Sequence, residues 1–330
     1  MTLAVAGWRR SFSIGYRGGL VLVLLGLCVA FGLITDHFWS AVTFRTLANQ
    51  LPPLVIASAG LTLVLIAGGI DLSVGSVLAL AAAVLGVLTV DQGLPLLLAA
   101  LVALAVGGLC GAINGALVAR WSIPSFLVTL GMLEIARGST YLVTASRTSY
   151  LGDRVSALGA NLPVLGLSAA FVGSLAVVGA LQFVLSRTAF GRWVFAVGGN
   201  RTALHRCGVR PSRVQFAVFT LAGLLAAAAG LCQVGYLQSA DPNAAIGMEL
   251  SAIAAVVIGG TSLLGGRGSV TGTLLGVLVI AVLQTGLAQA GATEPTKRII
   301  TGAAILLAVA TDVWRRRRSA DAGSRRGLDP

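Results

Sequence analysis

The chain has 330 residues, of which 56% are hydrophobic and only 10% are charged. A soluble domain carries about 25% charged residues, so this chain has too few polar side chains to cover a surface in contact with water. The composition therefore excludes a soluble globular protein and predicts one that is embedded in a lipid bilayer. A net charge of +12 is also typical of nucleic-acid-binding proteins. Because its distribution along the chain indicates membrane topology instead, we expect no nucleic-acid partner.

The N-terminal segment 1–17 contains three arginines and precedes an apolar stretch, an arrangement that resembles a secretory signal peptide. The apolar stretch Gly18 to Ile34 is about 17 residues long, however, and no A-x-A cleavage site follows it. We therefore predict a short cytoplasmic tail at 1–17, followed by a first membrane span that the mature protein retains.

A helix needs about 20 apolar residues to cross a bilayer. Ten stretches of the chain approach this length, although the fifth carries two charges and the eighth is short. They are 18–35, 51–70, 72–90, 94–118, 124–145, 162–185, 214–235, 249–264, 270–289 and 298–313. The sequence thus predicts an all-α polytopic membrane protein of about ten transmembrane helices, with one transmembrane domain at 18–313 and a basic cytoplasmic tail at 314–330.

The basic residues test this topology independently of hydropathy. With the N-terminus in the cytoplasm and ten spans, seventeen of the 23 basic residues fall in cytoplasmic segments and five in external ones. This is the asymmetry that the positive-inside rule expects. It favours an even number of spans, with both termini in the cytoplasm.

The fourth span contains Gly107, Gly108, Gly111 and Gly115, which are spaced at about one helical turn. In a membrane, small residues at this spacing allow the backbones of two helices to approach closely. The sequence therefore predicts a tight helix–helix contact along this span.

The longest hydrophilic stretch, 186–213, faces the cytoplasm in this topology and holds six arginines. Between a Gly-Gly pair and Gly208, the residues Arg201–Cys207 are predicted to form a short helix that Asn200 caps. Such a helix suits the docking of a soluble partner. On the residues alone, a solvated connector whose arginines only fix the topology is an equal alternative.

Asp71 interrupts almost forty apolar residues within the segment Ala67–Ser76, directly after Gly68 and Gly69. The simpler interpretation is a tight turn between two spans, in which Asp71 caps the second helix. The alternative is a discontinuous helix whose free backbone groups line a polar cavity, as in many transporters.

Glu134 lies ten residues after Pro124, about 15 Å into the membrane at the rise of an α-helix. Arg137 follows three residues later on the same face, where the two side chains can pair. Charges at this depth usually face an aqueous pathway or the interior of a helix bundle. The two residues are thus candidates for a translocation path, and a self-neutralising structural pair is the alternative.

The segment Glu249–Ser269 resembles Gly68–Ser76 in its Gly/Ser-rich turns, a weak sign of internal duplication. It is not a phosphate-binding loop, because G-x-x-x-x-G-K-[ST] occurs nowhere in the chain. The chain also lacks the motifs of hydrolases and metalloproteases and any Cys/His cluster, so we expect no catalytic residues, no metal site and no cofactor. If transport is coupled to chemistry, another subunit must supply it.

Six motifs occur in order along the chain: Gly68–Ser76, Gly111–Gly115, Ile135–Gly138, Phe190–Asn200, Ala252–Ser262 and Gly265–Gly276. Together they resemble the ribose/xylose/arabinose-type permease family of bacterial ABC sugar importers. The resemblance runs from about residue 45 to 313.

The resemblance implies two permease subunits, identical or paralogous, in the bacterial inner membrane. They would work with an ATP-binding cassette subunit that holds ATP and Mg²⁺, and with a periplasmic solute-binding protein. The loop at 186–213 would then couple the permease to the ATPase, which favours docking over the connector. The implied coupling residues are Gly191, Arg192, Gly198, Gly199, Asn200 and Gly208, and the candidate path residues are Asp71, Asn114, Glu134 and Arg137.

The expected function is therefore a permease subunit, not an enzyme, that forms the path for a monosaccharide or a similar polyol-like solute. The main alternative is an ion-coupled secondary transporter, although only Glu134 offers a titratable group well inside a span. A membrane scaffold protein without transport is a third interpretation.

Overall fold

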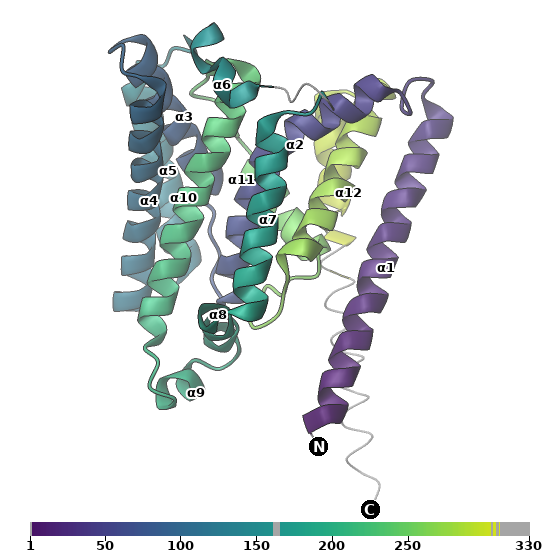
Figure 1. The fold of residues 1–330 in the computed structure, drawn as a ribbon, viewed down its shortest axis with the longest axis vertical. Coiled ribbons are helices and arrows are strands. Elements are labelled where there is room, and N and C mark those ends of the chain that lie inside the picture. Colours follow the sequence, from purple (N-terminus) through teal and green to yellow (C-terminus); the bar gives the residue numbers. More distant parts are fainter. Residues whose placement is uncertain (1, 161–165, 305, 308–309, 311–330) are drawn as a thin grey trace, which may run out of the picture.

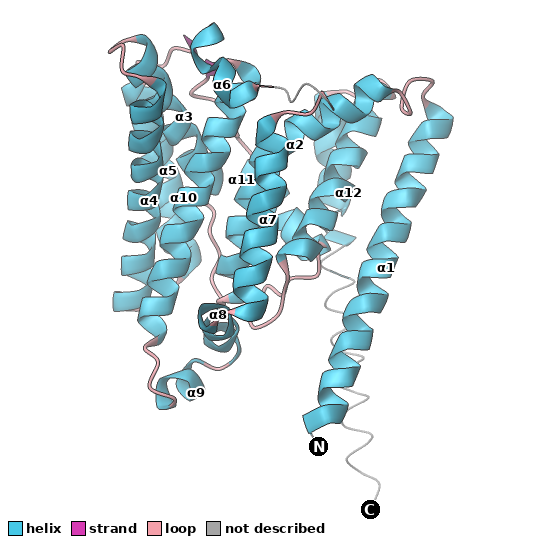
Figure 2. Cartoon of the chain, viewed as in Figure 1, coloured by secondary structure: helices cyan, strands magenta, loops and turns pink. Residues whose placement is uncertain are grey.

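The computed structural model describes residues 2–160, 166–304, 306–307 and 310. They form a bundle of helices, with two strands of two residues each at one end (Figures 1 and 2). The long helices are α1 (Thr2–Ile34), α2 (Ala41–Ile66), α4 (Leu96–Trp121), α5 (Ser125–Val143), α7 (Ala169–Arg187), α10 (Pro211–Leu237) and α12 (Val270–Gln289). The shorter helices are α3 (Val74–Val90), α6 (Ser156–Gly159), α8 (Ala189–Gly199), α9 (Arg201–Arg206), α11 (Met248–Ile258) and the 3-10 turn η1 (Gly152–Val155). Residues 294–304 are helical as well.

Seven of the described helices are long and apolar enough to cross a membrane, namely α2, α4, α5, α7, α10, α12 and the part of α1 from Arg17. The all-α polytopic architecture is thus confirmed, whereas the exact count of ten spans is not. The third and eighth predicted spans become the shorter helices α3 and α11. The tenth, 298–313, and the basic tail, 314–330, lie partly and wholly outside the described residues.

The second helix starts ten residues before the predicted boundary. Its N-cap is Ser40, whose Oγ accepts a hydrogen bond of 3.1 Å from the Thr43 backbone N–H. Hydropathy does not detect this start, because residues 41–50 include polar side chains and an arginine. The ribbon of α2 bends in Figure 1, and Pro52 and Pro53, which cannot donate backbone hydrogen bonds, lie inside this helix.

The core of the bundle is formed by α3 and by α2 from Leu51 onward, where most residues are buried. α2 packs against α10, α7 and α12, and α3 packs against α10, α4 and α5, so the two consecutive helices do not form a hairpin. Helix α1 lies at the edge of the bundle against α12 (Figure 1), and most of its membrane span is exposed.

Helices α4 and α10 pack in the close contact that the glycine spacing predicts. A Cβ on Gly111 would overlap the Phe219 carbonyl oxygen, and one on Gly223 would overlap the Gly107 carbonyl oxygen. No side chain larger than hydrogen fits at these positions, so dispersion between the two backbones stabilises the pair.

Two helices start inside the bundle after a non-helical segment, which consists mainly of turns in the case of α11. Residues 67–73 separate α2 from α3, and β2 (Ser239–Ala240) with residues 241–247 separates α10 from α11. The starts of the two helices meet, because a Cβ on Gly75 of α3 would overlap a carboxylate oxygen of Glu249 in α11. Seven non-helical residues separate α2 from α3, and the two helices pack mainly against other partners, so the tight-turn interpretation of 67–76 is wrong and the structure has the discontinuous arrangement.

The two ends of the bundle differ in charge. Helices α8 and α9 lie together at one end (Figure 1), where Arg187, Arg192, Arg201, Arg206, Arg210 and Arg213 are exposed. We call this the basic end. At the opposite end, β1 (Ser149–Tyr150) pairs antiparallel with β2, Ser149 opposite Ala240.

Candidate functional site

The extended segment 67–73 holds a buried carboxylate. Asp71 is 2% exposed, and its Oδ1 accepts hydrogen bonds from the Ser73 backbone N–H at 2.8 Å and from the Ser73 hydroxyl at 2.6 Å. The Asn114 Nδ2 of α4 donates to the Ser73 oxygen at 3.1 Å. The structure thus brings two of the four predicted path residues, Asp71 and Asn114, to one network through Ser73. The prediction that Asp71 caps the helix is wrong, because the N-cap of α3 is Ser73.

Hydroxyl groups of α5 satisfy the backbone of the same segment. The Ile70 N–H donates to Ser125 Oγ at 2.9 Å, and the Leu72 N–H donates to Thr129 Oγ1 at 3.1 Å. Non-helical backbone at membrane depth requires such partners, because lipid offers none. The first turn of α5 therefore fixes the position from which α3 starts.

Arg137 of α5 holds the second non-helical segment, the turns at 241–247. Its Nη1 donates to the carbonyl oxygens of Pro242 and Ala244, each at 2.9 Å. The alternative of a self-neutralising pair with Glu134 is wrong: among the described residues no ion pair joins the two, and Glu134 is exposed on the outer face of α5. The side chains diverge because Arg137 reaches carbonyl groups of the turns that precede α11.

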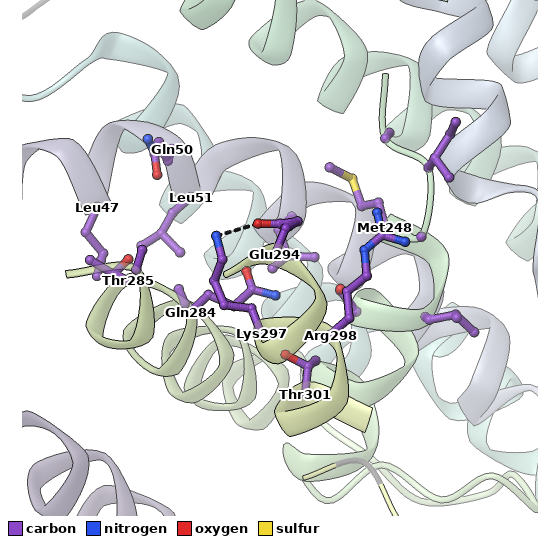
Figure 3. Close-up of a pocket in the computed structure, with 18 of the residues that line it drawn as sticks. Leu47, Gln50, Leu51, Met248, Gln284, Thr285, Glu294, Lys297, Arg298 and Thr301 are labelled. Carbon is purple, nitrogen blue, oxygen red and sulfur yellow. Dashed lines mark ion pairs between the residues drawn. The ribbon is translucent and has the colours of Figure 1, made fainter. Parts of the chain in front are cut away.

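A cavity of about 890 Å³ lies between α2, the start of α11, α12 and the helix at 294–304 (Figure 3). It is on the side of the bundle away from the basic end, since it is lined by the first half of α2 and the second half of α12. Its polar lining consists mainly of uncharged side chains, which are Thr46, Gln50, Gln233, Ser251, Gln284, Thr285, Gln289 and Thr301. None of the four predicted path residues lines it.

One hydrogen bond and one ion pair fix part of the wall of this cavity. Gln289 Nε2 donates to Thr43 Oγ1 at 2.8 Å, which joins α12 to α2. Lys297 and Glu294 form an ion pair at 2.5 Å (Figure 3). In contrast, Gln233 Oε1 and Thr301 Oγ1 are buried and have no hydrogen-bond partner among the described residues.

The cavity was not predicted, although the sequence carries a signal for it. Gln233 and Gln284 lie inside the predicted spans 214–235 and 270–289. A carboxamide inside an apolar span is costly unless it finds a polar partner, so amides in two spans indicate a shared polar site. This signal does not identify Gln50, because Gln50 precedes the predicted second span.

Helix α8 ends in a glycine junction with two other segments. A Cβ on Gly198 would overlap the Ile66 carbonyl oxygen at the end of α2, and one on Gly265 would lie 2.9 Å from the Gly68 Cα. The Gly266 N–H also donates to the Ile66 carbonyl oxygen at 2.8 Å. The end of α8, the segment after α2 and the turn between α11 and α12 therefore touch through backbone alone.

The 186–213 region is more helical than the sequence suggests. Gly191, Gly198 and Gly199 lie within α8, which was not expected, whereas α9 and its Asn200 cap match the prediction. The Asn200 Oδ1 accepts from the Ala203 N–H at 2.9 Å. A Cβ on Gly199 would meet no atom within 4 Å, so this glycine faces open space next to the junction.

Among the residues 2–160, 166–304, 306–307 and 310, no group of three or more His, Cys, Asp or Glu side chains is placed to hold a metal ion.

Comparison with known proteins identifies the kind of molecule that has this architecture. Residues 43–309 match the family described as "Branched-chain amino acid transport system / permease component". The chain is 39% identical over 308 residues to the fructose import permease protein FrcC of Rhizobium meliloti, covering 90% of this chain and 85% of the relative. It is 35% identical over 325 residues to the ribose import permease protein RbsC of Escherichia coli K12, covering 94% and 99%.

The name of a third relative specifies no solute. It is the probable ABC transporter permease protein YphD of Escherichia coli K12, which is 37% identical over 306 residues, or 92% of this chain and 91% of the relative. No solved structure matches the chain. The family match and the three relatives show that this multi-pass inner-membrane protein belongs to the family of permease components of bacterial ABC importers.

Proposed function

We propose that this chain is the permease subunit of an importer for a monosaccharide, and that a separate ATPase subunit drives it by docking on α8 and α9. The relatives with full-length similarity are named for fructose and ribose import, which favours a sugar over a branched-chain amino acid. The chain itself supplies the path and no chemistry, so ATP and Mg²⁺ bind to the partner.

The observation that carries the coupling proposal is the glycine junction. The backbone of α8 touches the end of α2 and the α11–α12 turn directly. A rigid-body displacement of α8 therefore pushes both segments, because no flexible side chain lies between them to absorb the movement. The segment after α2 leads into α3, and the turn at 259–269 ends α11. A force applied at α8 therefore reaches both helices that start inside the bundle.

The arginines define the side on which the ATPase binds. Six exposed arginines lie in 186–213, and Arg17 at the same end donates to Ser269 Oγ at 3.2 Å. The positive-inside rule places this end in the cytoplasm. The opposite end, where the cavity lies, then faces the periplasm and a solute-binding protein.

The exposed Glu134 supports a second permease subunit. A carboxylate on the outer face of a membrane helix costs about 2.5–3.5 kcal/mol if lipid covers it. A partner permease, identical or paralogous, would cover the exposed face of α5 that Glu134 shares with Gly131 and Gly138. In this arrangement Glu134 belongs to the subunit interface, and Asp71, Asn114 and Arg137 position the two non-helical segments beside the path.

The coupling proposal is tested with a bulky residue at the open glycine of α8. A Cβ at position 199 meets no atom within 4 Å in this chain, so we expect Gly199→Trp to fold and to interfere with a neighbouring subunit. The matched control is Gly173→Trp on α7, where the glycine also faces open space. In proteoliposomes with the ATPase and the binding protein, we expect Gly199→Trp to abolish ATP-driven sugar uptake and Gly173→Trp to retain it.

Full uptake by Gly199→Trp would contradict docking at this site. An ion-coupled secondary transporter predicts a different result, in which uptake by intact cells survives ATP depletion and stops when the proton gradient collapses. A scaffold protein predicts no uptake under either condition.

A further inference from the structure

We infer that the cavity between α2, α11, α12 and the 294–304 helix is a binding site for a monosaccharide within each permease subunit. The inference rests on the proposed function and adds to it the place where the solute binds. It assigns the contacts to Gln233, Gln284 and Thr301, which line the cavity.

The amide and hydroxyl groups that line the cavity suit a sugar. Carboxamides both donate and accept hydrogen bonds, as do hydroxyl groups, so glutamine and threonine side chains are complementary to the hydroxyls of a sugar. Three helices contribute amides to this space, from Gln50 in α2, Gln233 in α10 and Gln284 in α12. A gap that served only for packing within a membrane protein would be lined by apolar side chains instead.

Two polar atoms of the lining lack a hydrogen-bond partner among the described residues. Thr301 is 9% exposed and its Oγ1 lacks a hydrogen-bond partner among the described residues, and the same holds for the buried Oε1 of Gln233. Buried polar groups are almost always hydrogen-bonded, so an orphaned pair in one cavity indicates a polar occupant. Figure 3 shows Thr301 and Gln284 among the side chains around this space.

The charged groups at the cavity favour a neutral solute over an amino acid. Glu294 and Lys297 at the mouth neutralise each other in an ion pair, and the Oε1 of Glu249 accepts from the Gly247 N–H at 3.1 Å. Glu294, the carboxylate among the described residues that line the cavity, is therefore engaged in the ion pair, and Arg298 is the remaining charged side chain of this lining. The other carboxylate oxygen of Glu249, Oε2, is buried without a hydrogen-bond partner among the described residues, but Glu249 does not line the cavity. The described lining thus offers no free carboxylate to the ammonium group of an amino acid. A neutral polyhydroxylated solute needs no such partner.

Size and walls fit the same ligand. A volume of about 890 Å³ lies within the range of roughly 300–1,000 Å³ that is typical of small-molecule sites. Leu47, Leu51 and Met248 supply apolar surface against which the C–H faces of a sugar ring can pack (Figure 3).

The cavity is also connected to the glycine junction. Residues 245–248, 250 and 251, at the start of α11, form one wall, and α11 ends at the turn that touches α8. A displacement of α8 therefore changes the shape of the site, which allows a bound solute to be released toward the cytoplasm.

The test uses cysteine protection in a chain whose four native cysteines are replaced by alanine. Thr301→Cys places a thiol in the cavity, and Thr293→Cys places one on an exposed residue outside its lining. Right-side-out vesicles that contain the complete transporter are treated with a membrane-impermeant maleimide, alone or with D-fructose, D-ribose or L-leucine. We expect both thiols to react, and one of the two sugars to slow only the reaction at position 301, several-fold.

Three outcomes would overturn the inference. They are a thiol at position 301 that stays unreactive while position 293 reacts, a reaction that neither sugar slows, and protection by L-leucine in place of a sugar. Uptake by the unmodified transporter distinguishes a failure of the proposed site from a failure of the proposed function. If it imports a sugar that gives no protection, the site is wrong and the function stands, whereas import of neither sugar removes the proposed function itself.

A second measurement does not depend on labelling. Thr301→Val and Gln233→Leu remove the unsatisfied atoms with little change in volume, and we expect a several-fold fall in the maximal uptake rate while the amount of protein in the membrane is unchanged. The matched control is Thr271→Val, because the hydroxyl of Thr271 is also buried without a partner among the described residues but lies outside the cavity. Equal uptake by all three variants would contradict the assigned contacts.

Discussion

Gly198 at the end of α8 and Ile66 at the end of α2 meet through their backbones, with no room for a side chain between them. A Cβ on Gly198 would overlap the Ile66 carbonyl oxygen and would lie 2.6 Å from the Gly266 nitrogen. The contact joins segments that are more than a hundred residues apart in the sequence. It requires glycine at position 198, whereas the adjacent Gly199 is unconstrained within the chain.

Gly198→Ala is therefore expected to separate α8 from α2 and to impair coupling. ATP hydrolysis by the assembled transporter should lose most of its stimulation by the solute-loaded binding protein, and uptake should fall with it. Gly199→Ala is the matched control, because its Cβ meets no atom of this chain. Normal stimulation in Gly198→Ala would show that the junction is not part of the coupling route.

Replacement of Asp71 is expected to lower the stability of the fold, because hydrogen bonds to its carboxylate are lost. Asp71→Leu removes the acceptor of the Ser73 N–H and hydroxyl and should lower the free energy of unfolding by about 1–3 kcal/mol. Asp71→Asn keeps an oxygen at the same place and should cost less. Thermal unfolding in detergent measures both, with exposed Asp91→Asn as control. An equal loss in the Asn and Leu variants would indicate that the negative charge itself is required.

Arg137 is expected to stabilise the segment that precedes α11. Hydrogen bonds from a charged donor contribute about 1.5–3 kcal/mol each, so Arg137→Gln should lower the unfolding temperature clearly and Arg137→Lys should restore part of it. Arg147→Gln, at an exposed arginine, provides the control. If uptake falls in Arg137→Gln without a change in unfolding temperature, the residue acts in the path and not as a structural anchor.

A buried hydroxyl pair joins α2 to α12. The Oγ1 atoms of Thr62 and Thr273 are 2.7 Å apart, and the Thr62 hydroxyl is also placed to donate to the Ser58 carbonyl at 2.7 Å. Hydrogen bonds between membrane helices contribute about 0.6 kcal/mol on average, so a double-mutant cycle of Thr62→Val and Thr273→Val should give a coupling energy of this order. Strict additivity of the two single variants in thermal unfolding would show that the pair contributes nothing.

The features that depend on composition and short-range sequence were predictable. Apolar length identified the seven long spans, and the glycine spacing of α4 identified its contact with α10. The cap of α9 by Asn200 was also predictable, because the bond spans only three residues. Each of these signals lies within one helix or its immediate neighbourhood.

The rest depended on contacts between distant segments. Hydropathy treats 72–90 and 249–264 as ordinary spans because it measures how apolar a stretch is and not where its backbone becomes helical. The bonds of Arg137 to Pro242 and Ala244 cross more than a hundred residues, and no local pattern favours them over the near pair with Glu134. The cavity likewise requires amides from three helices to be placed together.

The shortness of α11 has a consequence for biogenesis. At 11 residues and 1.5 Å per residue it is about 16 Å long, too short for the insertion machinery to treat it as an independent span. Its entry must therefore wait until α2, α3 and α12, against which it packs, offer a protein surface in place of lipid. We therefore expect this part of the permease to assemble after α12 has been synthesised, and the cavity that it borders to be completed only then.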